Sequence, residues 1–423
     1  MRRIAAYIAI FMAIISCSKM TDGGTGALTK YRNVMLLYSA GYNNLSSPML
    51  RNITELEEGY VPMDMSSNDV MLIFNRRTEG YLNFTSLVPP VLMEVKRNWQ
   101  GEVQVDTVKT WPAETKASSA ETLHEVLYYI KEHYPADGYG VVFSSHATGY
   151  LPEGYYSNPE GSSGDEGDDD DVWSVSNRTR RVRHFEAEPL TKSLGADYSG
   201  VVGENLESFE IELPALAEAI PMHLDYFLFD ACLMGGIEVA YELKDKCDII
   251  GFSPTEVLSQ GFYYDSMGKY LLGGKVPDPE AVCREYLDKY LHGSTKAASV
   301  TVVDCRKIGP LVNVCKTLFE KYRNEIAGLS PTGIQVYFRD NKHWFYDLED
   351  ILLHAGINES EKALLAQALD DFIIFKGHTD TFFTINFSHY SGLSMFLPSH
   401  SGDQLKLYYR DKIAWNKATA LVK

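Results

Sequence analysis

Residues 139–146 read YGVVFSSH and residues 224–232 read LDYFLFDAC. Both are short, mostly apolar runs rich in Val, Phe and Leu, which is typical of a buried strand in a parallel sheet. The first run ends in His146 and the second in Cys232. Because ligands and reacting groups collect at the carboxyl edge of open α/β sheets, the two runs predict a thiol nucleophile with an imidazole partner at one edge.

Other segments extend this pattern along the chain. Residues 122–134 carry apolar side chains at helical spacing, and strand-like apolar runs lie on both sides of them. Strands that alternate with helices predict an α/β fold with a mostly parallel sheet covered on both faces. We expect a domain at 31–295 and a C-terminal subdomain at 296–423. The strand-like runs are 34–38, 70–74, 103–108 and 249–252.

Composition narrows the function classes. The chain has 423 residues, is 45% hydrophobic and carries a formal net charge of −18, so it can form a large core. The negative charge disfavours a nucleic-acid binder, because phosphate backbones need clustered Lys and Arg. No expected strand is followed by a Gly-rich phosphate-binding loop, which disfavours a nucleotide-binding protein. The sequence leaves the oligomeric state open.

The N-terminus has the pattern of an export signal. Arg2 and Arg3 precede an apolar run at 4–15 that is short for a membrane-spanning helix. The run ends in IISC at residues 14–17, which resembles the bacterial lipobox. It predicts a signal peptide at 1–17, lipidation of Cys17 and a flexible tether at 18–30. Ser18 then favours an outer-membrane lipoprotein of the cell envelope, and an ordinary signal peptide is the alternative.

The chain has six cysteines. If Cys17 is lipidated, five remain, and an odd number in an oxidising compartment leaves at least one thiol unpaired. Cys232 is the candidate for that thiol. We expect the others to be buried small hydrophobic residues; they are Cys247, Cys283, Cys305 and Cys315.

The pattern of strands and helices breaks between His146 and Cys232. Residues 153–190 contain a Gly/Ser-rich stretch, an acidic run at 165–171 and a basic cluster, which predicts an exposed loop. Calcium binding by the acidic run is a weak alternative, because its spacing does not match that of paired-helix calcium loops. We therefore expect neither a metal ion nor another cofactor. The basic cluster consists of Arg178, Arg180, Arg181 and Arg183.

Residues after Cys232 have helical spacing, which predicts a helix that begins at or just after this cysteine. A thiol at a helix N-terminus lies near partial positive charge, which favours the thiolate. The N–H groups of the same turn are candidates for binding an oxyanion.

Five segments together resemble the clostripain family of cysteine peptidases, which have a caspase-like fold. Their order along the chain carries the resemblance, which covers roughly residues 31–420. The segments are LLYSAGYNNL at 36–45, SHATGY at 145–150, FDACLM at 229–234, SPTE at 253–256 and SGLSMFLP at 391–398.

The resemblance implies a cysteine endopeptidase that acts on a protein or peptide. Cys232 would be the nucleophile and His146 the general acid and base. The N–H groups of Cys232 and Ala147 would hold the oxyanion. The family usually has Gly where this chain has Ala147, and Ala tolerates positive φ poorly. Either the turn avoids that conformation or the oxyanion hole is impaired.

The resemblance also implies cleavage after Arg or Lys. The pocket aspartate of the family, two residues before the nucleophile, corresponds to Asp230, and a carboxylate there would pair with a cationic side chain. The alternative is that Asp230 caps the following helix. Glu256 and Asp265 are further acidic candidates for the pocket.

Relatives of this kind cut themselves between their histidine and cysteine. The basic cluster is therefore a candidate site of self-cleavage. Two other functions stay open: an inactive family member that binds a partner at the cell surface, and a different cysteine hydrolase or transpeptidase on the same fold.

Overall fold

The structure is a computed structural model. It describes residues 30–63, 67–79, 83–156, 197–201, 207–338 and 344–423. The expected signal peptide, Cys17 and nearly all of the tether lie outside these residues. So do most of the expected loop at 153–190 and the whole basic cluster.

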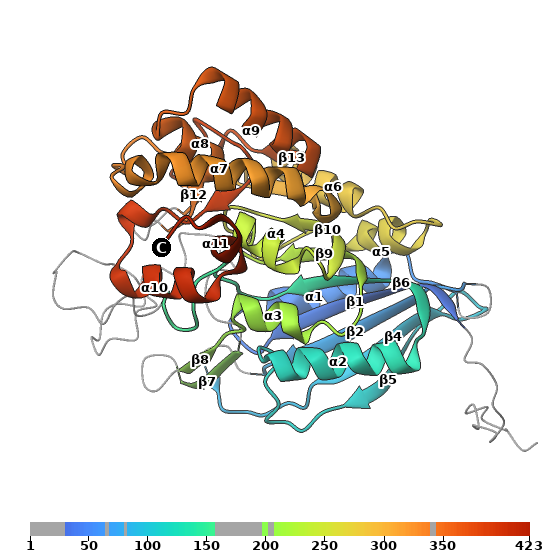
Figure 1. Cartoon of the computed structure of the whole chain (residues 1–423). Coiled ribbons are helices and arrows are strands. Elements are labelled where there is room, and N and C mark those ends of the chain that lie inside the picture. The colour runs from blue at the N-terminus through green and yellow to red at the C-terminus, as the bar shows by residue number, and fades with distance from the viewer. Residues whose placement is uncertain (1–29, 64–66, 80–82, 157–196, 202–206, 339–343) are drawn as a thin grey trace, which may run out of the picture.

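A nine-stranded sheet forms the centre of the molecule, in the order β13-β11-β10-β9-β6-β1-β2-β4-β5 (Figure 1). The five strands from β10 to β2 are parallel, and the strands outside them pair in antiparallel fashion. The expected mostly parallel sheet is therefore confirmed. The strands are β1 (Tyr31–Gly41), β2 (Val70–Arg77), β4 (Val91–Arg97), β5 (Val103–Thr110), β6 (Ala136–Ser144), β9 (Leu224–Asp230), β10 (Cys247–Phe252), β11 (Ser299–Asp304) and β13 (Ile373–His378).

Helices cover both faces of the sheet, as its continuous apolar strands require. On one face α1 (Ser46–Glu58), α5 (Tyr264–Leu272) and α6 (Pro279–His292) pack in a row. On the other face α2 (Ala120–His133), α3 (Leu213–Ala219) and α4 (Ile237–Leu243) do the same (Figure 1). Helix α1 connects the parallel strands β1 and β2, whereas α3 and α4 lead to β9 and β10 on the other side of β1, so right-handed crossovers place them on opposite faces.

The remaining elements are short strands and the helices that follow β11. The strands are β3 (Asn83–Phe84), β7 (Asp197–Val201), β8 (Glu207–Phe209), β12 (Tyr346–Asp347), β14 (Thr381–Phe382), β15 (Ile385–Asn386) and β16 (Ser394–Met395). The helices are η1 (Cys305–Lys307), α7 (Ile308–Ala327), α8 (Leu348–His354), α9 (Glu359–Phe372), η2 (Pro398–His400), α10 (Asp403–Lys412) and α11 (Ala414–Thr419).

The C-terminal part shares its sheet and core with the rest of the chain. Strands β11 and β13 both follow residue 295, yet they extend the central sheet beyond β10. One buried cluster contains apolar residues from both sides of this position. The expected boundary near 295 thus does not separate two sheets.

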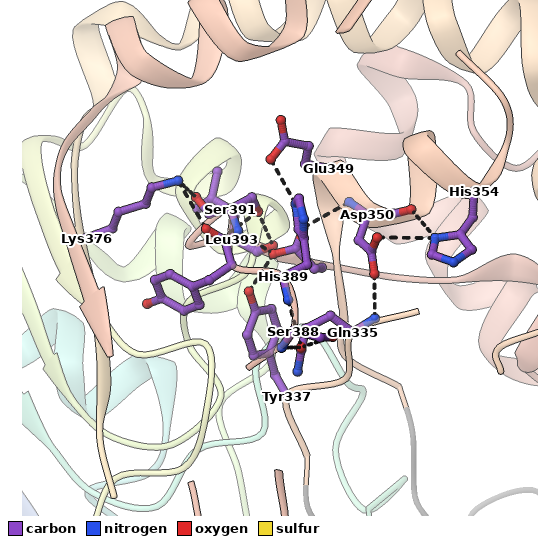
Figure 2. A network of polar contacts seen from close by, with 12 residues as sticks. Gln335, Tyr337, Glu349, Asp350, His354, Lys376, Ser388, His389, Ser391 and Leu393 are labelled. Carbon is purple, nitrogen blue, oxygen red and sulfur yellow. Dashed lines mark hydrogen bonds and ion pairs between the residues drawn. The ribbon is translucent and has the colours of Figure 1, made fainter. Parts of the chain in front are cut away.

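A polar network fixes the chain that leads into β16 (Figure 2). The side-chain oxygen of Gln335 accepts hydrogen bonds from the N–H groups of Ser388 and His389, at 2.8 and 3.3 Å. His389 Nε2 lies 2.9 Å from Glu349 Oε2, and this hydrogen bond raises the pKa of His389. The buried Asp347 accepts from the Ser391 N–H at 2.7 Å. These contacts set the path of the chain into β16, which lies beside the loop after Cys232.

Candidate active site

His146 and Cys232 lie at the same edge of the sheet, as the sequence predicted. Strands β6 and β9 are parallel neighbours, and Ser144 pairs with Asp230 at their carboxyl ends. Each candidate residue follows two positions after this pair. Both side chains are buried, with 4% of His146 and 0% of Cys232 exposed.

Asn44 holds the imidazole from the neighbouring strand. It follows the end of β1, which pairs with β6, and its Oδ1 lies 2.7 Å from Nε2 of His146. Because a carbonyl oxygen only accepts, Nε2 is the donor, and Nδ1 is the basic nitrogen of the neutral ring. The segment LLYSAGYNNL contained this residue, but the sequence alone did not show that Asn44 contacts the histidine.

The main chain of Val257 contacts the sulfur of Cys232. The Val257 N–H donates to Sγ at 3.0 Å, and the Val257 carbonyl oxygen lies 3.5 Å from the same atom. An N–H group that points at sulfur stabilises negative charge there. Two further bonds, from the Leu233 N–H to the Thr255 oxygen and from the Gly235 N–H to the Ser253 oxygen, hold the loop at 231–236 against the 253–257 segment.

The expectation that a helix begins at or just after Cys232 is wrong. Helix α4 begins at Ile237, with Gly236 as its N-cap. Leu233 has a left-handed φ of 59°, so the residue directly after the cysteine is not helical. Main-chain groups of the 231–236 loop also form hydrogen bonds with neighbouring segments instead of within a helix. A helix N-terminus therefore does not activate this thiol.

The turn after His146 avoids the conformation that Ala tolerates poorly. Ala147 is not among the described residues with positive φ, whereas Gly149 has a φ of +62°. This confirms the first of the two alternatives for Ala147. A Cβ atom at Gly149 would lie 2.7 Å from the Leu233 oxygen, so this turn packs directly on the 231–236 loop.

A small cavity of about 40 Å³ lies beside His146. Its walls come from the turn after His146, from Met234, from the ends of β6 and β9, and from the chain around Glu210 that leads into α3. Cys232 is not among the residues that line the cavity. The thiol is thus covered in this conformation.

Asp230 is buried and its carboxylate binds within the protein. Its Oδ2 accepts from the Ser144 hydroxyl at 2.9 Å and from the Tyr264 hydroxyl at 2.5 Å. Since Gly236 caps α4, the alternative that Asp230 caps the following helix is wrong. Gly261 has a φ of +60°, and a Cβ atom there would lie 2.4 Å from Oδ1, so only glycine fits beside this carboxylate.

The other two acidic candidates occupy different places. Glu256 is buried directly before Val257 and so lies next to the sulfur-binding main chain. Asp265 is exposed in the first turn of α5, with its carbonyl group beside Gly59. Gly59 ends α1 at the opposite end from Asn44. The structure therefore brings Glu256 to Cys232, whereas Asp265 lies apart from the partner of His146.

The remaining described cysteines are free and buried. Burial raises the pKa of the Cys283 and Cys315 thiols, which keeps both protonated. A hydrogen bond with Cys305 contributes most to the raised pKa of Cys247. The environments of Cys247, Cys283 and Cys315 therefore disfavour a thiolate.

The described residues contain neither a metal-binding cluster nor a membrane-spanning helix. No group of three or more His, Cys, Asp or Glu side chains in them is arranged to hold a metal ion. No helix within the same residues has the length and apolar character needed to cross a membrane. The acidic run considered for calcium lies outside the described part of the chain.

The described architecture is a mostly parallel sheet covered by helices, with His146 and Cys232 directly after neighbouring strand ends. The sequence profile of the clostripain family matches residues 37–184 and 185–419, and the chain belongs to this family. It is 24% identical to clostripain of Hathewaya histolytica over 250 residues. That alignment covers 55% of this chain and 41% of clostripain, so the chain spans less than half the length of this curated relative.

Solved structures agree on the fold. An inactive zymogen of a C11 protease from Parabacteroides distasonis superimposes with a TM-score of 0.72 at 23% identity, covering 93% of this chain and 99% of that one. Iotapain, a secreted C11 cysteine protease from Bacteroides thetaiotaomicron, gives a TM-score of 0.71 at 23% identity, covering 92% and 99%. A complex of a secreted C11 cysteine protease from the same organism with an irreversible peptide inhibitor gives 0.68 at 20% identity, covering 92% and 98%.

Proposed function

We propose that the protein is a cysteine endopeptidase that uses Cys232 and His146 as a catalytic dyad. The observation that carries this proposal is the placement of the two residues directly after the paired ends of β6 and β9. The thiolate attacks a peptide carbonyl carbon, and His146 takes the thiol proton on Nδ1 and gives it to the leaving amine. Water then releases the acyl group from sulfur.

The oxyanion of this reaction would be held by the N–H groups of Cys232 and Ala147. Catalysis requires the covered thiol to become accessible, since no part of Cys232 is exposed. One structural relative is an inactive zymogen, and we propose that the covered thiol marks an inactive form of this chain as well. The same covered thiol would fit a family member that only binds partners. Labelling of Cys232 by an irreversible peptide inhibitor distinguishes the two, because only a reactive thiolate forms the adduct.

We propose cleavage after Arg or Lys, with Asp230 as the carboxylate that attracts the substrate cation. The negative charge of Asp230 already acts on Lys289, and burial lowers the pKa of this lysine. A peptide with Arg before the cleaved bond should react about a hundredfold faster than one with neutral citrulline, in kcat/KM. Asp230→Asn should remove most of this preference.

Asp265→Asn is the matched control, because Asp265 also acts on Lys289 but is exposed in the first turn of α5 instead of buried at the end of β9. The control should keep the preference for Arg. Equal cleavage of the Arg and citrulline peptides by the unmodified protein would refute the proposed specificity.

Self-cleavage is proposed after Arg178, Arg180, Arg181 or Arg183. These residues lie in the sequence between His146 and Cys232, so the chain links them to the dyad at both ends, which would raise their effective concentration there. Incubation of the purified protein should yield new N-termini at Thr179, Arg181, Val182 or His184. The same incubation of Cys232→Ala should leave one chain. An active enzyme that stays intact would contradict this prediction.

A lipid anchor at Cys17 is proposed from the basic start, short apolar run and lipobox-like tetrapeptide of the sequence. Iotapain, a structural relative, is described as secreted. Metabolic labelling with a fatty-acid analogue should mark the protein, and Cys17→Ala should abolish the label and the membrane association. Equal labelling of both proteins would exclude lipidation at this residue.

A further inference from the structure

The 231–236 loop is held from a second side by the C-terminal strap, which we define as residues 394–409. The Ser394 N–H donates to the Gly235 carbonyl oxygen at 2.9 Å, and Gly236 forms a parallel bridge with Ser394. The loop therefore lies between the 253–257 segment and the strap. Movement of the strap would therefore shift the loop that contains Cys232.

Glu238 fastens this strap to the start of α4. Its side chain is 0% exposed. One carboxyl oxygen, Oε1, accepts from the Phe396 N–H at 2.9 Å and from the Tyr409 hydroxyl at 2.8 Å. These partners stand 158 and 171 positions further along the chain. In Figure 1 the C-terminal helix α11 lies beside α4, and α10 precedes it.

The second oxygen of Glu238 faces the loop. Oε2 has no hydrogen-bond partner among the described residues, and neither has the hydroxyl of Ser394. A Cβ atom at Gly236 would lie 2.9 Å from Oε2 and 3.3 Å from Ser394 Oγ, so the two oxygens face the same space beside the loop. A buried carboxylate without a counter-charge is costly, whereas a carboxylic acid supplies a proton to this space.

No cation offsets a negative charge on this carboxyl group. Within the described residues, Glu238 takes part in no ion pair, and its ionisable neighbours are Tyr409, Tyr150 and, beside Tyr409, Cys315. Burial raises the pKa of Glu238 to about 7, although the Phe396 N–H, its own N–H and the Tyr409 hydroxyl favour the charged form. The carboxyl group therefore changes its charge near neutral pH.

We propose that Glu238 is a positioning residue whose protonated carboxyl group locks the C-terminal strap onto the loop that carries Cys232. The effect of this lock on catalysis rests on the proposed peptidase function, whereas the lock itself concerns only the strap and the loop at 231–236. When Glu238 loses its proton, its negative charge is buried without a counter-charge among the described residues, and loosening of the strap lets water solvate this charge. The loop at 231–236 then opens more often.

Hydrogen exchange of the Leu233 and Gly235 amides measures this opening without reference to activity. We expect their protection, corrected for intrinsic exchange, to fall about tenfold between pH 6 and pH 8.5 in the unmodified protein. Glu238→Gln keeps the side-chain shape and stays neutral, so its protection should be constant over this range. In an active preparation, kcat of the unmodified protein should fall over the same pH range. The Gln variant should lack this fall, with KM unchanged.

Glu242→Gln is the matched control. Glu242 lies one turn further along α4, is partly buried and accepts from the Ala414 N–H of α11, which lies outside the strap, at 3.1 Å. Its charge acts on Tyr408 of the strap, but its hydrogen bond is to α11 and not to the strap. This variant should keep the pH-dependent protection of the loop. Tyr409→Phe is a second test, because removal of the hydroxyl destabilises the charged Glu238 and should move the transition to higher pH.

A Glu238→Gln protein that keeps the wild-type pH dependence of loop protection overturns the proposal, as does a Tyr409→Phe protein with an unmoved transition. If Glu238→Gln does not fold, Tyr409→Phe alone decides. A pH-dependent loop in a protein without peptidase activity would support the lock while refuting the proposed function. Peptidase activity with pH-independent protection of the loop would support the proposed function while refuting the lock.

Discussion

Cys232→Ala is expected to lower kcat/KM for peptide cleavage about a thousandfold or more, and His146→Ala should do nearly the same. The two residues follow the paired ends of β6 and β9 and act as one unit. Without the sulfur there is no nucleophile, and without the imidazole the thiol keeps its proton. The double variant should therefore be hardly worse than either single variant. Steady-state kinetics on an Arg-containing peptide measures all three.

Cys283→Ala is the control for this experiment. Cys283 is buried against the sheet, since a Cβ atom at Gly251 would lie 2.6 Å from its sulfur. Its loss should lower the melting temperature and leave kcat/KM unchanged. An active preparation that keeps its rate after Cys232→Ala would show that another group is the nucleophile.

Gly235→Ala should damage both folding and activity. An added Cβ atom would lie 2.3 Å from the main-chain nitrogen of Pro254, and main chain cannot rotate away as a flexible side chain can. The loop is also held by bonds to Ser253 and Ser394, so it must shift as a whole. We expect a loss of about 2–3 kcal/mol in the free energy of unfolding, as for overpacked sites. We also expect kcat to fall by about tenfold to a hundredfold, because the thiol moves relative to His146.

Gly309→Ala tests whether this loss is specific to the loop. Gly309 lies in the first turn of α7, and a Cβ atom there has nothing within 4 Å. Alanine should stabilise this helix by about 0.5–1 kcal/mol. Urea unfolding of both variants gives the comparison. If Gly235→Ala is as stable and active as Gly309→Ala, the close approach of the loop to Pro254 has no consequence.

The placement of His146 and Cys232 could be predicted because buried parallel strands are continuous apolar runs, and such runs show where each strand ends. The loop after Cys232 could not be predicted in the same way. Its residues have helical spacing, but Leu233 and the two glycines after Met234 take other conformations to bond with distant segments. Those bonds come from chain that lies about 20 and 160 positions further on, which local spacing does not reveal.

Glu238 shows the same limit more sharply. In the sequence it stands four positions before Glu242 on one side of a helix, which is typical of a solvent-facing surface. The C-terminal strap covers this side and buries Glu238. Likewise, the antiparallel pairing of β10 with β11 joins the C-terminal part to the central sheet, and no local pattern indicates such a pairing. Long-range contacts thus decide the features that the sequence leaves undetermined.

The pairing of β6 with β9 has a consequence for the protein after a cut between them. Residues 140–144 pair with residues 226–230 in the middle of the sheet, so each fragment would contribute strands to one shared core. The two fragments would stay together without a covalent link as long as the sheet is intact. Once unfolded, however, they would have to find each other by diffusion, so renaturation of the nicked form would become second order and dependent on concentration. At low protein concentration, a single denaturation event would then be practically irreversible.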